Sequence, residues 1–318
     1  LKSIVNKFNL QNTVLGDVAL GAVIKHSSDW NLARECVIDS GLSIKTPGVD
    51  MHRACGTGLE TIMNIANKIA LDQIDSGIGG GVDSISDAPI VYNDNLRKIL
   101  LKSFTGKSLK EKLVPWSRMR PKLLKPKLPG VKEPRTGLSM GESTEIIAKD
   151  YAISRHDQDT LATESHAKAS RAYDEGFYKD LVVPFEGVEK DNIIRHDSTI
   201  QKLASLKTVF DKGVNATLTP GNSTSLTDGS AAVLLASDEW ANKNNLDIES
   251  LIRFENQMHE VNLDLKFIKV LKYLKFFYQE IKVKYKNGTI RNLWKEQNYL
   301  GQIFLIMNKK VYFCSGLI

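Results

Sequence analysis

One stretch of the sequence, residues 48–89, constrains the fold most because its pattern changes twice within a short distance. Val49 and Met51 are compatible with a short buried strand, and residues 74–82 predict a second strand that ends in three glycines. Between them, apolar residues recur at helical spacing: Leu59, Ile62, Met63, Ile65, Ala66 and Ile69. The stretch therefore predicts a strand, a tight turn, a helix and a second strand.

Cys55 lies in the predicted turn, directly before the predicted helix. The free N–H groups at a helix N-terminus favour a thiolate over a thiol, and the neighbouring glycines let other backbone approach the sulfur. These features predict a buried nucleophile that can be acylated. A small apolar core cysteine is the commoner alternative for a lone Cys, and Cys55 by itself leaves it open.

The segments around Cys55 resemble those of the thiolase family, the acetyl-CoA acyltransferases. CGTGLE at 55–60 resembles the nucleophile segment of that family, and GGGVDSIS at 79–86 resembles a second one. Further matches occur in the same order around 137–145 and 217–229, so the resemblance covers about residues 14–240. It implies an α/β fold in which a mixed five-stranded sheet lies between helix layers, with an inserted loop domain.

The resemblance also implies an activity and a site. In the family the cysteine matching Cys55 attacks a 3-ketoacyl-CoA, acetyl-CoA leaves, and CoA then takes the shortened acyl group in fatty-acid β-oxidation. Met140, Ser223 and Thr224 match substrate-binding positions, and Thr224 keeps the hydroxyl of the usual Ser. Coenzyme A is then a substrate, and neither a metal nor another cofactor is implied.

Residues 90–135 are dense in Lys, Arg and Pro and predict an insertion that is part helical and part extended. In thiolases a loop domain at this place covers the CoA site, and the basic run here most resembles the β-subunit branch of the fatty-acid oxidation complex. A basic cover would attract the nucleotide end of CoA. An ordinary solvated surface is an equally good interpretation.

Residues 247–318 do not follow the second half of a thiolase. No histidine follows His259, so the base of the G-H-P motif has no candidate, and Cys314 matches the C-x-G motif only by chance. We expect residues 1–246 to form the thiolase N-terminal domain and the remainder to be an atypical tail, as a truncated gene product would give. A catalytically impaired acyl-CoA-binding or lipid-binding protein is the main alternative. A ketoacyl-synthase type of enzyme is a weaker one, because it needs two further histidines.

Composition narrows the class of partner. The 318 residues carry a net charge of +6, but residues 251–318 hold 12 Lys or Arg against 5 Asp or Glu, so the remainder is close to neutral. No basic motif interleaved with aromatics argues for nucleic acid. An amphipathic helix predicted over 263–285 suits peripheral contact with an anionic membrane or a partner. The family implies a homodimer or association with a subunit of the fatty-acid oxidation complex.

Three cysteines suit a reducing compartment rather than a disulfide framework, and Cys36 is predicted to pack in the core. No apolar run is long enough to span a membrane. The sequence starts at Leu1, so we expect an N-terminal piece, with any targeting segment, to be missing. The predicted localisation is mitochondrial or cytoplasmic.

Local patterns predict further elements. Residues 16–26 have helical periodicity, and Asp29 is a predicted N-cap for a helix over 30–40. Ser154 is predicted to cap a long helix that ends at Gly176. The remaining expectations are a helix up to Tyr151, strands at 181–185 and 231–235, and a helix at 237–245.

Overall fold

The computed structural model of the protein describes residues 1–26, 30–128, 130 and 132–246, together with the backbone of three later strands. These strands are β5 (Lys282–Lys284), β6 (Ile290–Asn292) and β7 (Tyr312–Gly316). The helix predicted over 263–285 lies outside the described residues as far as 281, and it is wrong at 282–284, where β5 pairs antiparallel with β6. The cap predicted at Asp29 and the side chain of Cys314 also lie outside the described residues.

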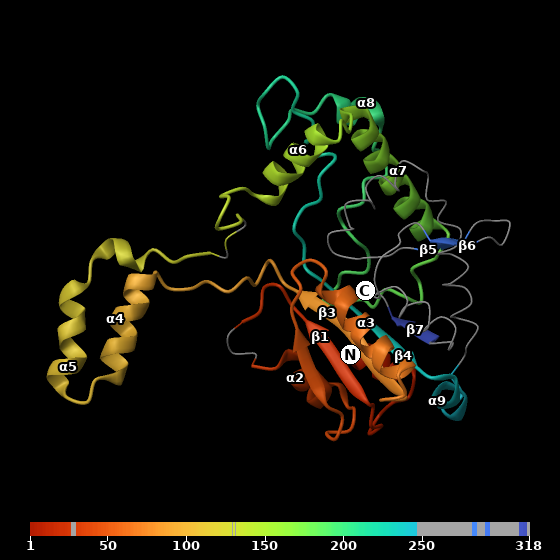
Figure 1. The fold of residues 1–318 in the computed structure, drawn as a ribbon, viewed down its shortest axis with the longest axis horizontal. Coiled ribbons are helices and arrows are strands. Elements are labelled where there is room, and N and C mark those ends of the chain that lie inside the picture. The colour runs from red at the N-terminus through yellow and green to blue at the C-terminus, as the bar shows by residue number, and fades with distance from the viewer. Residues whose placement is uncertain are drawn as a thin grey trace.

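A mixed β-sheet forms the centre of the fold (Figure 1). Its strands are β1 (Asp17–Gly21), β2 (Gly48–Met51), β3 (Ser76–Asp83) and β4 (Gly229–Ala236), in the order β2–β1–β3–β4, with β7 beyond β4. β1 runs parallel to β2 and β3, whereas β4 runs antiparallel to β3. The predicted α/β fold with a mixed sheet is confirmed.

Helices cover both faces of this sheet. α1 (Lys2–Lys7) and α2 (Leu32–Ser40) pack with Val18 and Leu20 of β1 in one apolar cluster. α3 (Thr57–Ala70) packs with Ala19 in a second cluster on the other face, because successive side chains of a strand point to opposite sides. Cys36 of α2 packs against the first cluster, which confirms its predicted place in the core.

Glycines in β3 allow α3 to lie directly on the sheet. A Cβ atom at Gly79 would lie 2.6 Å from the Cα atom of Ile62, and one at Gly77 would lie 2.8 Å from a methyl group of Ile65. Any larger residue would therefore push the helix away. The close seat of α3 fixes where its N-terminus, and the turn that precedes it, stand above the sheet.

The helix predicted from the pattern of residues 16–26 is wrong, since residues 17–21 form β1. All five residues of this strand are buried, so both of its faces are covered. A short run of this kind lacks the alternation that identifies a half-buried strand. The next predicted helix begins at Leu32, and its N-cap is Asn31, whose side chain accepts from the N–H of Arg34.

The strand predicted at 181–185 is also wrong. Residues 185–188 instead form a tight turn in which Phe185 and Val188 exchange backbone hydrogen bonds of 3.0 and 2.8 Å. The two residues at its tip, Glu186 and Gly187, have φ angles of 47° and 82°. Pro184 has no N–H to give to a neighbouring strand, which is consistent with this outcome.

Four helices follow the insertion within residues 132–246. α6 (Met140–Asp150) has a capping box of Ser139 and Glu142, and α7 (Arg155–Asp174) has the predicted Ser154 as its N-cap. α8 (Ile200–Ala204) precedes β4, and α9 (Asp238–Lys243) follows it. Among the described residues, no helix has both the length and the apolar character needed to cross a bilayer.

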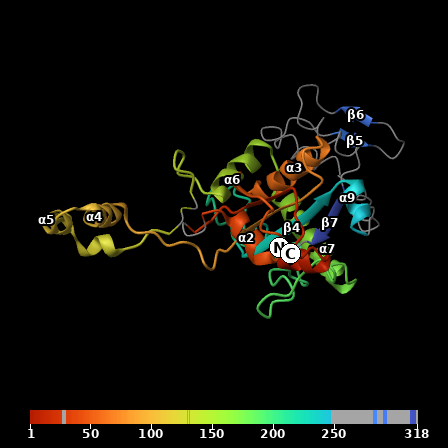
Figure 2. The same cartoon turned by 90° about the horizontal axis from the view of Figure 1, so that it is seen from below.

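Residues 94–124 form a helical excursion that extends away from the sheet (Figures 1 and 2). It contains α4 (Asp94–Thr105), α5 (Leu109–Leu113) and two 3₁₀ helices, η1 (Val114–Arg118) and η2 (Pro121–Leu124). A small apolar cluster of Leu96, Ile99 and Leu123 holds it together, separate from the two clusters of the sheet. Its two ends meet where Val91 and Lys127 exchange backbone hydrogen bonds of 3.0 and 2.8 Å.

Candidate active site around Cys55

Cys55 lies in the turn between the end of β2 and the start of α3, as the sequence predicts. Helix α3 begins at Thr57 and its N-cap is Gly56, so the thiol stands directly before the cap. The predicted burial of Cys55 is wrong, because the turn lies at the edge of the sheet and the side chain is exposed. An acyl thioester in solution can therefore reach this sulfur.

The turn has an unusual backbone conformation. Ala54 has a φ angle of 43°, in the left-handed region that costs a residue with a side chain about 1–2 kcal/mol. The N–H of Gly56 donates to the carbonyl of Arg53 at 3.0 Å, and the N–H of Thr57 donates to the carbonyl of Ala54 at 3.1 Å. These hydrogen bonds close the turn tightly and place Cys55 at its outer side.

The first turn of α3 carries no side-chain cap. Gly56 has no side-chain oxygen to offer to the N–H groups, unlike Asn31, the cap of α2, and Ser139, the cap of α6. Glu60, the one acid of this turn, is paired with Arg53 at 2.7 Å. The positive end of the helix dipole next to Cys55 is thus not neutralised by a capping side chain.

Asp83 holds the loop after β1 close to the end of β3. Its carboxylate accepts from the N–H groups of Val23 and Ile24 at 2.9 and 2.7 Å. Since β1, β2 and β3 are parallel, their carboxyl ends, and the Cys55 turn with them, lie at one edge of the sheet. Ligands of open α/β sheets bind outside this edge.

Asp228 holds the loop after β3 at the same edge, from the segment that leads into β4. Its carboxylate accepts from the N–H groups of Ile85 and Ser86 at 2.6 and 2.9 Å, and from the hydroxyl of Ser86. The Ser86 hydroxyl, followed by these N–H groups, holds the pKa of Asp228 below its usual range. The carboxylate therefore stays ionised and keeps both segments together at neutral pH.

A cavity of about 230 Å³ lies beside the strand that leads to Cys55. It is lined by Ala22, Val23, Lys25, Asp50, Met51 and His52. Lys25 and Asp50 form an ion pair of 2.5 Å in its wall. Burial alone would raise the pKa of Asp50. The N–H of Ala33, the Lys25 ammonium and the N–H of Leu32 lower it by more, so the pKa lies below its ordinary value. The cavity wall therefore carries a paired charge rather than a free one.

Met140, predicted to contact substrate, is the first residue of α6, and its side chain is largely exposed. Ser139 and Glu142 fix this helix start, because the Ser139 hydroxyl accepts from the N–H of Glu142 at 3.2 Å and the Glu142 carboxylate accepts from the N–H of Ser139 at 2.6 Å. Met140 is not among the residues that line the cavity beside β2, and neither is Cys55.

Ser223 and Thr224, the other two predicted substrate-binding residues, follow the turn at residues 217–222. The hydroxyl of Ser223 is buried and has no hydrogen-bond partner in the described part of the chain. Thr224 is exposed, and its hydroxyl donates only to the carbonyl of Ser225, at 3.3 Å. Neither residue lines the cavity beside β2, so Met140, Ser223 and Thr224 stay predictions as substrate contacts.

Sequence reasoning missed the acids that position this turn. Glu145 of α6 is buried, and it accepts from the N–H and hydroxyl of Thr217 at 2.7 and 2.9 Å and from the N–H of Leu218 at 2.8 Å. Asp159 of α7 is also buried and accepts from the side-chain amide of Asn222 at 2.9 Å. Glu145 and Asn222 lie in two segments that resemble the family, but the sequence of neither segment indicates that the two segments are in contact.

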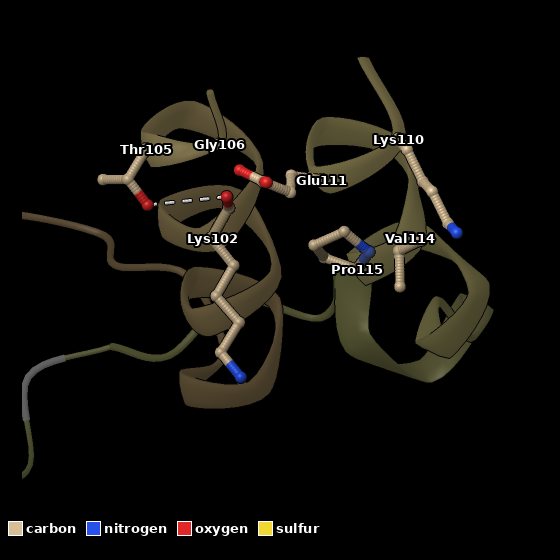
Figure 3. A pocket seen from close by; sticks show the side chains of 7 residues that line it. All are labelled: Lys102, Thr105, Gly106, Lys110, Glu111, Val114 and Pro115. Carbon is tan, nitrogen blue, oxygen red and sulfur yellow. Dashed lines mark hydrogen bonds between the residues drawn. The ribbon is translucent and has the colours of Figure 1, made fainter. Parts of the chain in front are cut away.

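A larger cavity, of about 410 Å³, lies in the excursion between α4 and η1 (Figure 3). Lys102 and Lys110 line it, but their ammonium groups point in different directions, and Glu111 adds a negative charge. The carboxylate of Glu111 already accepts from the N–H of Lys107 at 2.8 Å. This arrangement does not converge on a single anion, so it gives the prediction of a basic CoA cover no particular support.

Comparisons with known proteins agree with the fold around Cys55. Residues 1–239 match the family described as "Thiolase, N-terminal domain". The 3-ketoacyl-CoA thiolases of Yersinia pestis (strain Pestoides F) and Yersinia pseudotuberculosis serotype O:3 (strain YPIII) are each 37% identical over 247 residues, which is 76% of this chain and 56% of each relative. The chain thus spans little more than half the length of these relatives.

Two solved structures resemble the described fold. The Bacillus anthracis acetyl-CoA acetyltransferase has a TM-score of 0.61 at 26% identity, over 77% of this chain and 60% of the other. Human mitochondrial 3-ketoacyl-CoA thiolase, solved in complex with CoA, has a TM-score of 0.62 at 26% identity, over 77% and 59%. Both similarities extend over about the same share of this chain.

Proposed function

Because this chain belongs to the thiolase family, we propose that it is a thiolase-type acyltransferase whose Cys55 accepts the acyl group of a 3-ketoacyl-CoA. The observation that carries the proposal is the position of Cys55. The thiol is exposed, it directly precedes the uncapped N-terminus of α3, and it lies at the carboxyl edge of the sheet. A nucleophile in this place is accessible to an acyl thioester and lies at the positive end of a helix dipole.

The proposed reaction has two transfers. The Cys55 thiolate attacks the 3-keto carbon, the bond between C2 and C3 breaks, and its electron pair leaves as the enolate of acetyl-CoA, which takes up a proton. The thiolate of a second CoA then attacks the acyl-cysteine and releases the shortened acyl-CoA and the Cys55 thiolate. The first transfer needs a nucleophile and a site for the oxyanion, and the later steps need an acid and a base.

Met140, Ser223 and Thr224 are proposed to contact the pantetheine part of CoA. The buried hydroxyl of Ser223 without a partner in the described residues supports this, since buried polar groups are normally hydrogen-bonded. The network of Glu145, Asp159 and Asn222 would hold that segment in place for a ligand. Fatty-acid β-oxidation is the proposed setting, and CoA is the only cosubstrate that this chemistry needs.

A second function is favoured by one observation at the same site. Among the described residues, the thiol of Cys55 has no hydrogen-bond partner that would serve as a base. A chain that binds acyl-CoA and takes up an acyl group, but releases it slowly, fits this observation.

The proposal also includes partners and a location. We propose that the chain associates with a second copy, or with a subunit of a fatty-acid oxidation complex, in mitochondria or the cytoplasm.

Intact-mass spectrometry tests the acyl-enzyme directly. The purified chain is incubated with acetoacetyl-CoA and with a longer 3-ketoacyl-CoA, quenched in acid and digested for peptide mapping. We expect the acyl group on the peptide that contains Cys55, its loss in Cys55→Ser and its retention in Cys36→Ser. An acyl group on another cysteine, or none at all under conditions in which CoA binding is measured, would contradict the assignment.

A further inference from the structure

Thr57, the first residue of α3, contacts the turn around Cys55 with its hydroxyl group. This hydroxyl accepts a hydrogen bond from the N–H of Arg53 at 2.8 Å and donates one to the carbonyl of Ala54 at 2.6 Å. It thereby links the N–H of Arg53 to the carbonyl of Ala54. The side chain is 4% exposed, so water does not replace these two hydrogen bonds easily.

The methyl group of Thr57 is fixed from the other side. A Cβ atom at Gly21, in β1, would lie 2.1 Å from the Cγ2 atom of Thr57 and 2.5 Å from the carbonyl oxygen of Met51. Thr57 therefore occupies the space that a side chain at position 21 would need. One side chain is thus anchored by packing on β1 and uses its hydroxyl to hold the turn.

We propose that Thr57 is the positioning residue of the nucleophile, because its hydroxyl maintains the left-handed conformation of Ala54 and so sets the place of the Cys55 thiol. The inference rests on the proposed function of Cys55. Ala54 carries a side chain, so its φ angle of 43° is not favoured by the residue itself and needs support from its surroundings. The hydroxyl of Thr57 gives that support by bonding the N–H of Arg53, before Ala54, and the carbonyl of Ala54 itself.

Loss of the hydroxyl would have two effects on the turn. The N–H of Arg53 would lose its acceptor, and the carbonyl of Ala54 would keep only the N–H of Thr57, at 3.1 Å. The turn would then relax toward conformations that Ala54 prefers, and the thiol would leave its place before Gly56. A nucleophile that is displaced from its position loses much of its reactivity.

Two substitutions separate the hydroxyl from the methyl group. Thr57→Val keeps the shape and removes the hydroxyl, whereas Thr57→Ser keeps the hydroxyl and removes the methyl group. Thr61→Val is the matched control. Thr61 lies one turn later in α3 and is fully buried, and its hydroxyl donates to the carbonyls of Gly58 and Gly80 at 2.7 and 3.0 Å, away from the turn.

The measurement is the rate of alkylation of Cys55 by iodoacetamide at neutral pH, followed by peptide mapping. We expect Thr57→Val to slow alkylation of Cys55 by about tenfold. Thr57→Ser should restore the rate to within about twofold of the parent, even if its thermal midpoint falls, because the hydroxyl and not the methyl group holds the turn. Thr61→Val should leave the rate unchanged.

Three results would overturn the inference: an unchanged rate in Thr57→Val, an equal loss in Thr57→Ser, or an equal loss in Thr61→Val. Circular dichroism reports whether each variant folds, and Thr57→Ala replaces Thr57→Val in the same comparison if the latter does not. Alkylation needs no acyl-CoA. If the parent chain is alkylated at Cys55 but takes up no acyl group, the proposed function is refuted. The alkylation rates of the variants still decide the role of Thr57 in that case.

Discussion

The carboxylate of Asp228 accepts a hydrogen bond of 2.9 Å from the N–H of Ser86, although 142 residues separate the two in the chain. The contact joins the loop after β3 to the segment that enters β4, at the edge of the sheet where the Cys55 turn lies. The shape of this edge therefore depends on a charge that titrates.

Asp228→Asn should lower the thermal midpoint at neutral pH, with a smaller effect in acid. The folded chain holds the pKa of Asp228 below its ordinary value of 3.8. The stabilisation is therefore complete above about pH 4 and is lost as the pH falls through the lowered pKa. Midpoints measured from neutral pH to pH 2 check this. Asp174→Asn, at an exposed position, is the control, and a difference that grows in acid would refute the prediction.

Glu145→Gln should destabilise the chain by about 1–3 kcal/mol, because an amide group cannot accept all three hydrogen bonds that the buried carboxylate accepts. The free energy of unfolding from urea titration measures the loss. Glu164→Gln is the matched control, since Glu164 is exposed on α7 and pairs only with Lys168, at 3.2 Å. A loss of equal size in the control would show that Glu145 has no special role.

Gly79→Ala should destabilise the chain by about 1–3 kcal/mol, because its Cβ atom would lie 2.6 Å from the Cα atom of Ile62 and would force α3 off the sheet. Gly58→Ala is the contrasting change. A Cβ atom at Gly58 meets nothing within 4 Å, and alanine favours the helix, so stability should rise by about 0.5–1 kcal/mol. Urea titration gives the change in the free energy of unfolding for each variant. Two changes of the same sign would contradict the prediction.

Thiolysis by the 318-residue chain should be slower than that of a full-length relative by about a hundredfold or more, since no base for CoA is found in its sequence after His259. Assays with acetoacetyl-CoA and a longer 3-ketoacyl-CoA measure the steady-state rate. A single stoichiometric burst of acetyl-CoA is expected, and Cys55→Ser should abolish it. Sustained turnover at ordinary enzyme rates would show that residues 247–318 supply the missing groups.

The unit from β2 to β3 was predictable because each of its elements has its own periodicity, although the strand continues to Asp83, beyond the three glycines that were expected to end it. β1 was not, since a short strand buried on both faces has no alternation that separates it from a helix. Cys55 could be placed before a helix, but its exposure depends on what lies over the edge of the sheet. The bonds of Glu145 to Thr217 and of Asp83 to Ile24 join distant segments, and no local pattern contains them.

Val91 and Lys127 meet and close residues 92–126 into a separate segment. Both ends of this segment leave the body of the protein at the same point, joined by two backbone hydrogen bonds, and its Leu96, Ile99 and Leu123 are buried in a cluster of their own. A shorter link between positions 91 and 127 would leave the register of β3 against β4 unchanged. The length and charge of residues 92–126 therefore do not set the register of the strands that present Cys55.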